Sequence, residues 1–214
     1  MRTIRELDAS EVRVLGALME KEQATPDHYP MTINALIAAC NQKSNREPVT
    51  ELSETQVVEA LDRLRKDVLA WRSDGARVER WSQSISRRLG LNTPSKAILT
   101  LLMLRGPQTP GQLRSRSGRL YAFSELAEVE ATLREMAAGD TPLAVALERQ
   151  PGTKESRWAH RLGPEPARDF ASSTTVPPPQ PSTDPGLSER LEAVERRVEE
   201  LARELASLQE ELGS

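Results

Sequence analysis

The side chains best suited to nucleophilic or metal chemistry in this sequence are one cysteine, Cys40, and two histidines, His28 and His160. Cys40 closes an apolar run with i, i+3, i+4, i+7 spacing that begins at Ile33, so it falls on the buried stripe of a helix. Burial makes a cysteine a small hydrophobe and raises its pKa, which favours a structural role. His28 lies in a loop between prolines, and His160 alternates with apolar residues on a strand, where a core or boundary histidine is the ordinary case.

The sequence adds no catalytic pattern to these residues. It contains no Cys/His metal spacing, no nucleophile elbow, no glycine-rich phosphate loop and no evident acid–base pair. We therefore expect no enzymatic activity, no cofactor and no bound metal.

Basic side chains form the other candidate site, because lysine and arginine neutralise phosphates. They follow the Cys40 helix, flank two expected hairpins and follow a short helix that begins near residue 110. These candidate nucleic-acid contacts are Lys43, Arg46, Arg72, Arg77, Arg114, Arg116, Arg119, Arg149, Lys154 and Arg157. Each alone is more simply a solvated surface charge, but together they suit contact with a nucleic-acid backbone.

Composition and charge limit the class of protein. Aromatic residues make up only 3%, which disfavours the stacking platforms that bind single strands. The net charge of -3 divides unevenly: residues 1–90 are neutral, with 14 basic and 14 acidic residues, residues 91–166 carry +2, and residues 167–214 carry -5. The single cysteine fits a reducing compartment and the N-terminus has no secretory signal, so a cytoplasmic location without membrane contact is expected.

Residues 1–90 predict three helices followed by a hairpin. The first helix is expected from Ser10, as its N-cap, to Glu22. Thr32 caps the second helix, and Ser53 opens the third with a capping box, on an apolar stripe that ends at Val68. This order is typical of a winged helix, in which the hairpin is the wing.

The first hairpin is predicted from Asp74-Gly75, because a type I′ turn needs positive φ at both central positions. A two-residue loop pairs Arg72 with Arg77 and Trp71 with Val78. Trp71 and Val78 are then expected to face the core, with the two arginines on the opposite face.

The same order repeats in the second half of the chain. Thr93-Pro94 opens a helix, Thr109-Pro110 opens a short one, and Ser124 caps a third. A second hairpin is expected around residues 150–153, and the third helices match at an offset of 72 residues. A duplication accounts for this better than a pair of unrelated helical domains.

The predicted fold class is therefore mainly α with small β-hairpins (α+β). We expect two tandem winged-helix domains at residues 1–90 and 91–162, a Pro-rich flexible linker at 163–186 and a C-terminal coiled-coil helix at 187–214. The heptad positions of that helix, expected to mediate homo-oligomerisation, are Leu187, Leu191, Val194, Val198, Leu201, Leu205, Leu208 and Leu212. Their mixed Leu/Val composition leaves the oligomer number and helix orientation open.

Three segments closely resemble the YceH-like bacterial proteins: "LGALMEKEQATPDHYPMTINALIAACNQKSNREPV" (15–49), "LRGPQTPGQLR" (104–114) and "RQPGTKESRW" (149–158). The resemblance covers about residues 5–162. It implies two tandem winged-helix domains in a cytoplasmic bacterial protein, and it supplies no catalytic residue.

The expected function is a non-enzymatic, nucleic-acid-associated regulatory one, with double-stranded DNA as the partner. The third helix of each domain would be the base reader, yet it opens with carboxylates that phosphates repel. These are Glu51, Glu54 and Glu59 in the first domain and Glu125, Glu128 and Glu130 in the second. Binding is therefore expected through wings and turns, and the alternative is a protein-interaction adaptor that uses the same surfaces without binding DNA.

Overall fold

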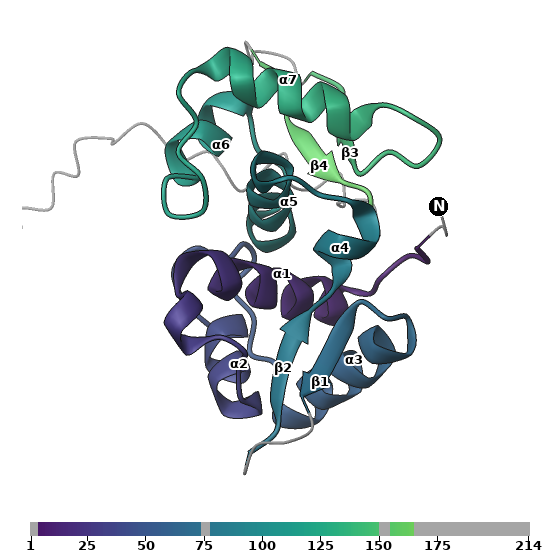
Figure 1. Ribbon diagram of the computed structural model, residues 1–214. Coiled ribbons are helices and arrows are strands. Elements are labelled where there is room, and N and C mark those ends of the chain that lie inside the picture. The colour runs from purple at the N-terminus through teal and green to yellow at the C-terminus, as the bar shows by residue number, and fades with distance from the viewer. Residues whose placement is uncertain (1–3, 74–77, 150–154, 165–214) are drawn as a thin grey trace, which may run out of the picture. The chain divides into compact units, whose positions relative to one another are not determined.

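The computed structural model describes residues 4–73, 78–149 and 155–164, which belong to one compact unit (Figure 1). The turn residues of both expected hairpins, the candidate contacts Arg77 and Lys154, the Pro-rich segment from residue 165 and the heptad segment lie outside these ranges. Among the described helices, none is both long and apolar enough to span a bilayer.

The first half, residues 4–90, has three main helices followed by a two-stranded antiparallel hairpin and a short fourth helix. Its elements are α1 (Ala9–Ala24), the 3-10 turn η1 (Pro26–His28), α2 (Ile33–Cys40), α3 (Glu54–Lys66), β1 (Ala70–Ser73), β2 (Arg80–Gln83) and α4 (Ile85–Leu89). The second half, residues 91–164, repeats the order of three helices and a hairpin. Its elements are α5 (Thr93–Arg105), α6 (Pro110–Arg116), α7 (Leu126–Ala137), β3 (Ala144–Ala146) and β4 (Trp158–His160). The predicted mixture of helices and small hairpins is confirmed.

A third short strand segment joins each hairpin in the same way. Met31, just before α2, exchanges two backbone hydrogen bonds with Trp81 of β2, at N···O distances of 3.0 and 2.7 Å. Gln108, just before α6, exchanges two with Trp158 of β4, at 3.0 and 2.8 Å. Both members of the second pair lie 77 residues after their counterparts in the first. The two halves therefore share the helix order and also the link between the hairpin and the start of the second helix.

Side-chain capping explains where most helices begin. Thr32, Ser53 and Thr109 accept hydrogen bonds from the first turns of α2, α3 and α6, as predicted. The prediction of Ser10 as the cap of α1 is wrong. Asp8 is the cap, and the Glu11 carboxylate bonds back to the Asp8 backbone N–H in a capping box.

The other helix boundaries also differ from the predictions by small shifts. Asn92, not Thr93, caps α5 by accepting from the Ser95 N–H at 2.9 Å. Ser124 does not cap α7: its N–H and hydroxyl both bond the Glu128 carboxylate, and the helix begins at Leu126.

The predicted register of the first hairpin is wrong. Arg72 pairs with Trp81 and Trp71 pairs with Ser82, four residues beyond the predicted partners. Trp81 is 3% exposed, whereas Trp71 is 62% exposed and Val78 is 56% exposed. The buried residue of this hairpin is thus Trp81, which the Met31 bridge holds against the core. Val68, expected on the stripe of α3, lies beyond the helix end with φ of 57° and is exposed.

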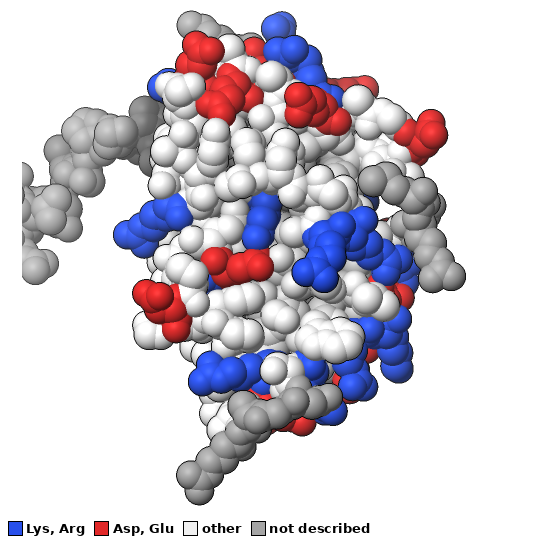
Figure 2. All heavy atoms as spheres, viewed as in Figure 1, with Lys and Arg blue, Asp and Glu red and all other residues white. Residues whose placement is uncertain are grey.

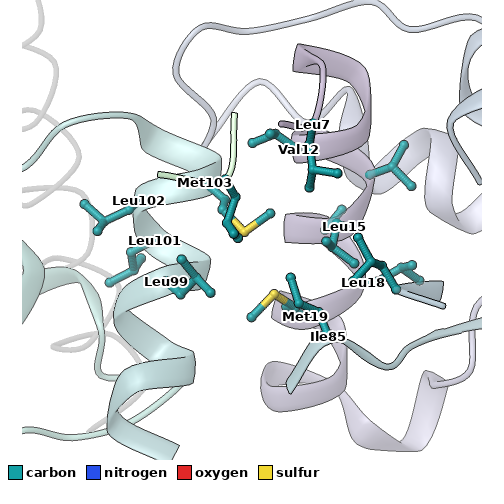
Figure 3. Close-up of a cluster of buried hydrophobic side chains, with 14 of the residues drawn as sticks. Leu7, Val12, Leu15, Leu18, Met19, Ile85, Leu99, Leu101, Leu102 and Met103 are labelled. Atoms are coloured by element: carbon teal, nitrogen blue, oxygen red, sulfur yellow. The ribbon is translucent and has the colours of Figure 1, made fainter. Parts of the chain in front are cut away.

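One hydrophobic core runs through both halves, and α1 and α5 are its centre (Figure 3). Leu99 and Met103 of α5 lie toward Met19 of α1 in this view, and all three are buried. The helices approach so closely that a Cβ at Gly16 would lie 3.0 Å from Leu104 Cδ2 and 3.2 Å from Met103 Cβ. A side chain at Gly16 would therefore push α5 away from α1.

Candidate nucleic-acid interface

Charge is strongly segregated within the first half of the chain. Residues 1–62 hold six Lys or Arg against eleven Asp or Glu, a net charge of -5. Residues 63–88 hold eight Lys or Arg against three Asp or Glu, a net charge of +5. This basic segment comprises the last turn of α3, the β1–β2 hairpin and α4. Basic side chains gather over α4 and the adjoining edge of α3 and the hairpin, whereas acidic side chains stand over α7 (Figure 2).

Exposed cations contribute most of this positive surface. Lys66, Arg80 and Arg87 are exposed, and Arg80 is oriented by a 2.9 Å bond from its Nη1 to the Pro30 carbonyl. Arg65 is exposed and lies 3.7 Å from Asp62, a distance at which solvent screens most of the attraction. We name these four residues, Arg65, Lys66, Arg80 and Arg87, the basic face.

Wing tips and turns were the predicted positions of the contacting cations, and the four residues of the basic face are not among those predicted. The signal was present in the pair Arg87-Arg88, which follows Ile85 in a short helix that was not predicted. Arg88 itself is half-buried, and its Nη1 donates to the Asp67 carbonyl. It positions α4 against the end of α3, so that Arg87 is left on the surface.

Three other candidates of the first half, Arg72, Arg77 and Lys43, lie outside the basic face as defined here. Arg72 is half-buried on β1 and forms a 3.0 Å ion pair with Glu79 across the hairpin. Arg77 lies outside the described residues. Lys43 is exposed in the turn after α2, far along the chain from the basic face.

Arg46 is removed from the candidate set, because its guanidinium is completely buried. Its two Nη atoms bond both oxygens of the Glu20 carboxylate, at 3.1 and 2.6 Å. The other donors reach the Ala39 carbonyl, at 3.0 and 2.8 Å, and the Asn45 carbonyl, at 2.8 Å. All five N–H groups of the guanidinium are satisfied inside the protein, so Arg46 holds the α2–α3 turn against α1 instead of meeting a ligand.

A second ion network ties the N-terminal segment to α3. Glu11 is buried, and its carboxylate accepts from Arg5 at 2.8 and 2.5 Å and from Arg63 at 3.2 Å. Burial opposes ionisation of Glu11, but the hydrogen bonds from Arg5 and the Asp8 backbone prevail and lower its pKa. Arg63 also pairs with Asp8 at 2.7 Å. These arginines are therefore neutralised within the structure.

The third helices carry the carboxylates that were predicted to discourage base reading. Glu54 and Glu59 are exposed on α3, whose cations lie instead in its last turn. On α7, Glu128 accepts from the Tyr121 hydroxyl at 2.7 Å and from the Ser124 backbone at 2.9 Å. The first turn of α3 is therefore acidic and exposed, and the carboxylate in the first turn of α7 is already hydrogen-bonded to Tyr121 and Ser124.

Three of the candidate residues of the second half donate hydrogen bonds within the protein. Arg116 donates to Gln108 Oε1 at 2.9 Å and Arg157 to the Pro107 carbonyl at 3.1 Å, so both support the segment before α6. Arg114 donates to the Ser124 carbonyl at 2.9 Å. Arg119 and Arg149 are exposed, and Lys154 lies outside the described residues.

The residues considered for nucleophilic or metal chemistry stand apart from one another. Cys40 is completely buried, and burial raises the pKa of its thiol to about 12. Burial also lowers the pKa of His160 to about 4, so its ring is neutral at pH 7. His28 is exposed in η1. Within the described residues, no group of three His, Cys, Asp or Glu side chains could hold a metal ion.

Comparison with known proteins shows one family throughout. Residues 7–153 match the family described as "Protein of unknown function, DUF480". A UPF0502 protein of Geobacter sulfurreducens is 47% identical over 203 residues, covering 94% of this chain and 90% of the relative. A UPF0502 protein of Acidovorax sp. is 42% identical over 214 residues, covering 98% and 95%. The chain therefore belongs to the DUF480 (UPF0502) family of bacterial proteins.

Proposed function

We propose that this protein is a non-enzymatic, nucleic-acid-associated regulator built from two winged-helix modules. In this proposal the first module binds duplex DNA through the basic face. The observation that carries the proposal is the segregation of charge, with +5 concentrated in the 26 residues from position 63 to 88.

The repeated bridge between the hairpin and the segment before the second helix supports the winged-helix assignment. In each half three helices precede an antiparallel hairpin, and the bridge makes the hairpin part of a three-stranded arrangement. In a winged helix the hairpin is the wing, and Arg80 lies on β2 of the first hairpin. The bridges support only the choice of fold, and the choice of binding surface is argued from the positive charge of residues 63–88.

The expected mode of binding is contact with phosphates. The exposed carboxylates of α3 disfavour insertion of its first turn into a groove, whereas arginine and lysine side chains bind phosphates of any sequence. Low sequence preference and steep salt dependence follow. Self-association through the heptad segment, proposed from the sequence, would place more than one basic face on the same duplex.

An adaptor function is the second candidate, and one feature of the hairpin favours it. Trp71 on β1 is 62% exposed, and Val68 and Val78 nearby in sequence are each 56% exposed. Exposed aromatic and aliphatic side chains of this kind are typical anchors for protein partners, and contact with phosphates does not require them. A Trp71→Ala variant therefore separates the two functions: it should abolish adaptor binding and leave phosphate contact almost unchanged.

The test is fluorescence anisotropy of labelled duplexes with full-length protein. Arg80→Glu with Arg87→Glu should weaken binding to random and genomic duplexes alike, because phosphate contacts carry no sequence information. Arg119→Glu with Arg134→Glu is the matched control: it changes net charge equally on exposed arginines of the second half and should have a much smaller effect. Equal weakening by both pairs would mean that general charge, not the basic face, causes the binding. Undiminished binding by the first pair would mean that the surface is wrong.

A further inference from the structure

A pocket of about 420 Å³ lies where the two halves meet. Its walls come from α1 and the segment before α3 in the first half, and from α5, the residues that follow it and β4 in the second. Most of the lining is apolar, including Val12, Leu102, Met103, Pro107 and Ala159. The volume falls within the range of about 300–1,000 Å³ that is typical of sites for small molecules.

Arg13 of α1 lines this pocket as a buried cation without a carboxylate partner. The residue is 4% exposed, and its Nη2 donates to the Pro48 carbonyl at 2.6 Å. Its Nη1 is buried and has no hydrogen-bond partner among the described residues, and no described carboxylate forms an ion pair with it. Burial and the nearby charge of Arg46 lower the pKa of Arg13 and outweigh the opposite influence of Cys40 and Glu20, so its surroundings disfavour the charged form.

Arg46 shows what a satisfied buried arginine looks like in the same structure. Glu20 neutralises Arg46 at 2.6 Å, and all five donors of that side chain have acceptors. Buried charges in proteins are normally paired in this way, since an uncompensated one costs several kcal/mol. Arg13 lacks the corresponding anion, and a ligand in the pocket can supply it.

The other polar groups of the pocket limit the charge of that ligand. His160 is neutral: its Nδ1 accepts from the Leu162 N–H at 3.3 Å, which leaves the proton on Nε2. Glu47 also lines the pocket and contributes a carboxylate to it. One cation without an ion-pair partner thus lies beside a neutral donor and one carboxylate, an arrangement that suits a single negative charge and disfavours a phosphate dianion.

We propose that this pocket binds a small amphipathic carboxylic acid. The carboxylate lies against Arg13 and gives its Nη1 the missing acceptor, and the apolar body of the molecule packs on Val12, Leu102 and Met103. Because the walls come from both halves of the chain, the bound acid would add contacts to the packing that already joins them. The site does not depend on DNA binding and can exist whether or not the protein contacts a nucleic acid.

The probe for this site is octanoate, compared with uncharged 1-octanol, on full-length protein by isothermal titration calorimetry. Octanoate should bind and raise the melting temperature, with at least tenfold higher affinity than 1-octanol. Arg13→Met should lower octanoate affinity by about 10–100-fold, the range for loss of a hydrogen bond to a charged group, and leave 1-octanol unchanged. Arg119→Met, the same substitution at an exposed position, should change neither affinity.

Two results would overturn the proposal without relying on the folding of the Arg13 variant. The first is a wild-type protein that binds 1-octanol as tightly as octanoate, or binds neither. The second comes from Ala9→Phe, which adds bulk at an exposed position in the first turn of α1 that lines the pocket. This variant should lower octanoate affinity at least tenfold, and octanoate binding equal to that of the wild type would show that the acid sits elsewhere.

Discussion

Arg46→Met should lower the free energy of unfolding by about 3–5 kcal/mol, the cost of breaking a buried ion pair by removing one partner. The substitution retains much of the apolar stem of Arg46 but removes its five donors. Glu20, whose side chain is only 15% exposed, then keeps its charge with Lys21 at 3.7 Å as the remaining cation within ion-pair distance among the described residues. The carbonyls of Ala39 and Asn45 lose their hydrogen bonds as well.

The magnitude can be resolved by urea unfolding of the wild type, Arg46→Met, Glu20→Leu and the double variant. Removing both charges should recover part of the loss, so the double-mutant cycle should show a favourable coupling between Arg46 and Glu20 of roughly 1 kcal/mol or more. Arg114→Met, an exposed arginine that bonds one carbonyl, is the control and should cost less than about 1 kcal/mol. A loss below about 1 kcal/mol for Arg46→Met would refute the structural role assigned to this residue.

The other predictions concern the core, the heptad segment and pH. Cys40→Ala should cost about 1 kcal/mol or more and Cys40→Asp far more, and the native thiol, with a pKa of about 12, should resist labelling at neutral pH; rapid labelling would contradict its burial. Full-length protein should self-associate and a version ending at Pro166 should be a folded monomer, so light scattering that gives one oligomeric state for both would exclude the heptad segment as the cause. His160 has a pKa of about 4 when folded against about 6.5 when unfolded, so the folded state binds fewer protons between these values. Stability should therefore fall by up to about 3 kcal/mol as pH is lowered from about 6.5 to about 4. His160→Gln should remove this component, and an unchanged pH profile of unfolding would show that His160 does not titrate in this way.

Local signals predicted the helices well because capping and periodicity are properties of neighbouring residues. Thr32, Ser53 and Thr109 could each be assigned as a cap from the residue itself and the three residues that follow it. The error at α1 was avoidable, since Asp8 followed by Glu11 has the acidic form of a capping box. Ser10 is also of a type favoured at N-caps, but the reciprocal hydrogen bonds between Asp8 and Glu11 place the cap at Asp8.

The hairpin register could not be read from its turn. Asp74-Gly75 is a strong local signal, but the strands end at Ser73 and begin again at Arg80. What selects this register is the burial of Trp81 and its bridge to Met31, a residue 50 positions earlier in the chain. Strand pairing is decided by such tertiary contacts more than by intrinsic preference.

The roles of individual arginines also depend on tertiary contacts that the sequence does not show. Arg46 looks like a surface charge in the sequence, and only its contact with Glu20, 26 residues away, shows that it is buried. Arg13 sits in an apolar helix and gives no signal in the sequence, because its burial without an ion-pair partner depends on Pro48 and on the second half of the chain. Arg80 and Arg87 are exposed on β2 and on the short helix α4, and their exposure depends on how those two elements pack.

The salt dependence of duplex binding by the full-length protein tests the proposed function most directly. Arg65, Lys66, Arg80 and Arg87 are exposed, and if each neutralises one phosphate the log–log slope should be about -3 to -4. Anisotropy measured from about 50 to about 200 mM salt should then show binding that weakens steeply and shows little preference among sequences. No detectable binding at the low-salt end, with the protein folded, would contradict DNA binding and leave the adaptor function as the better account.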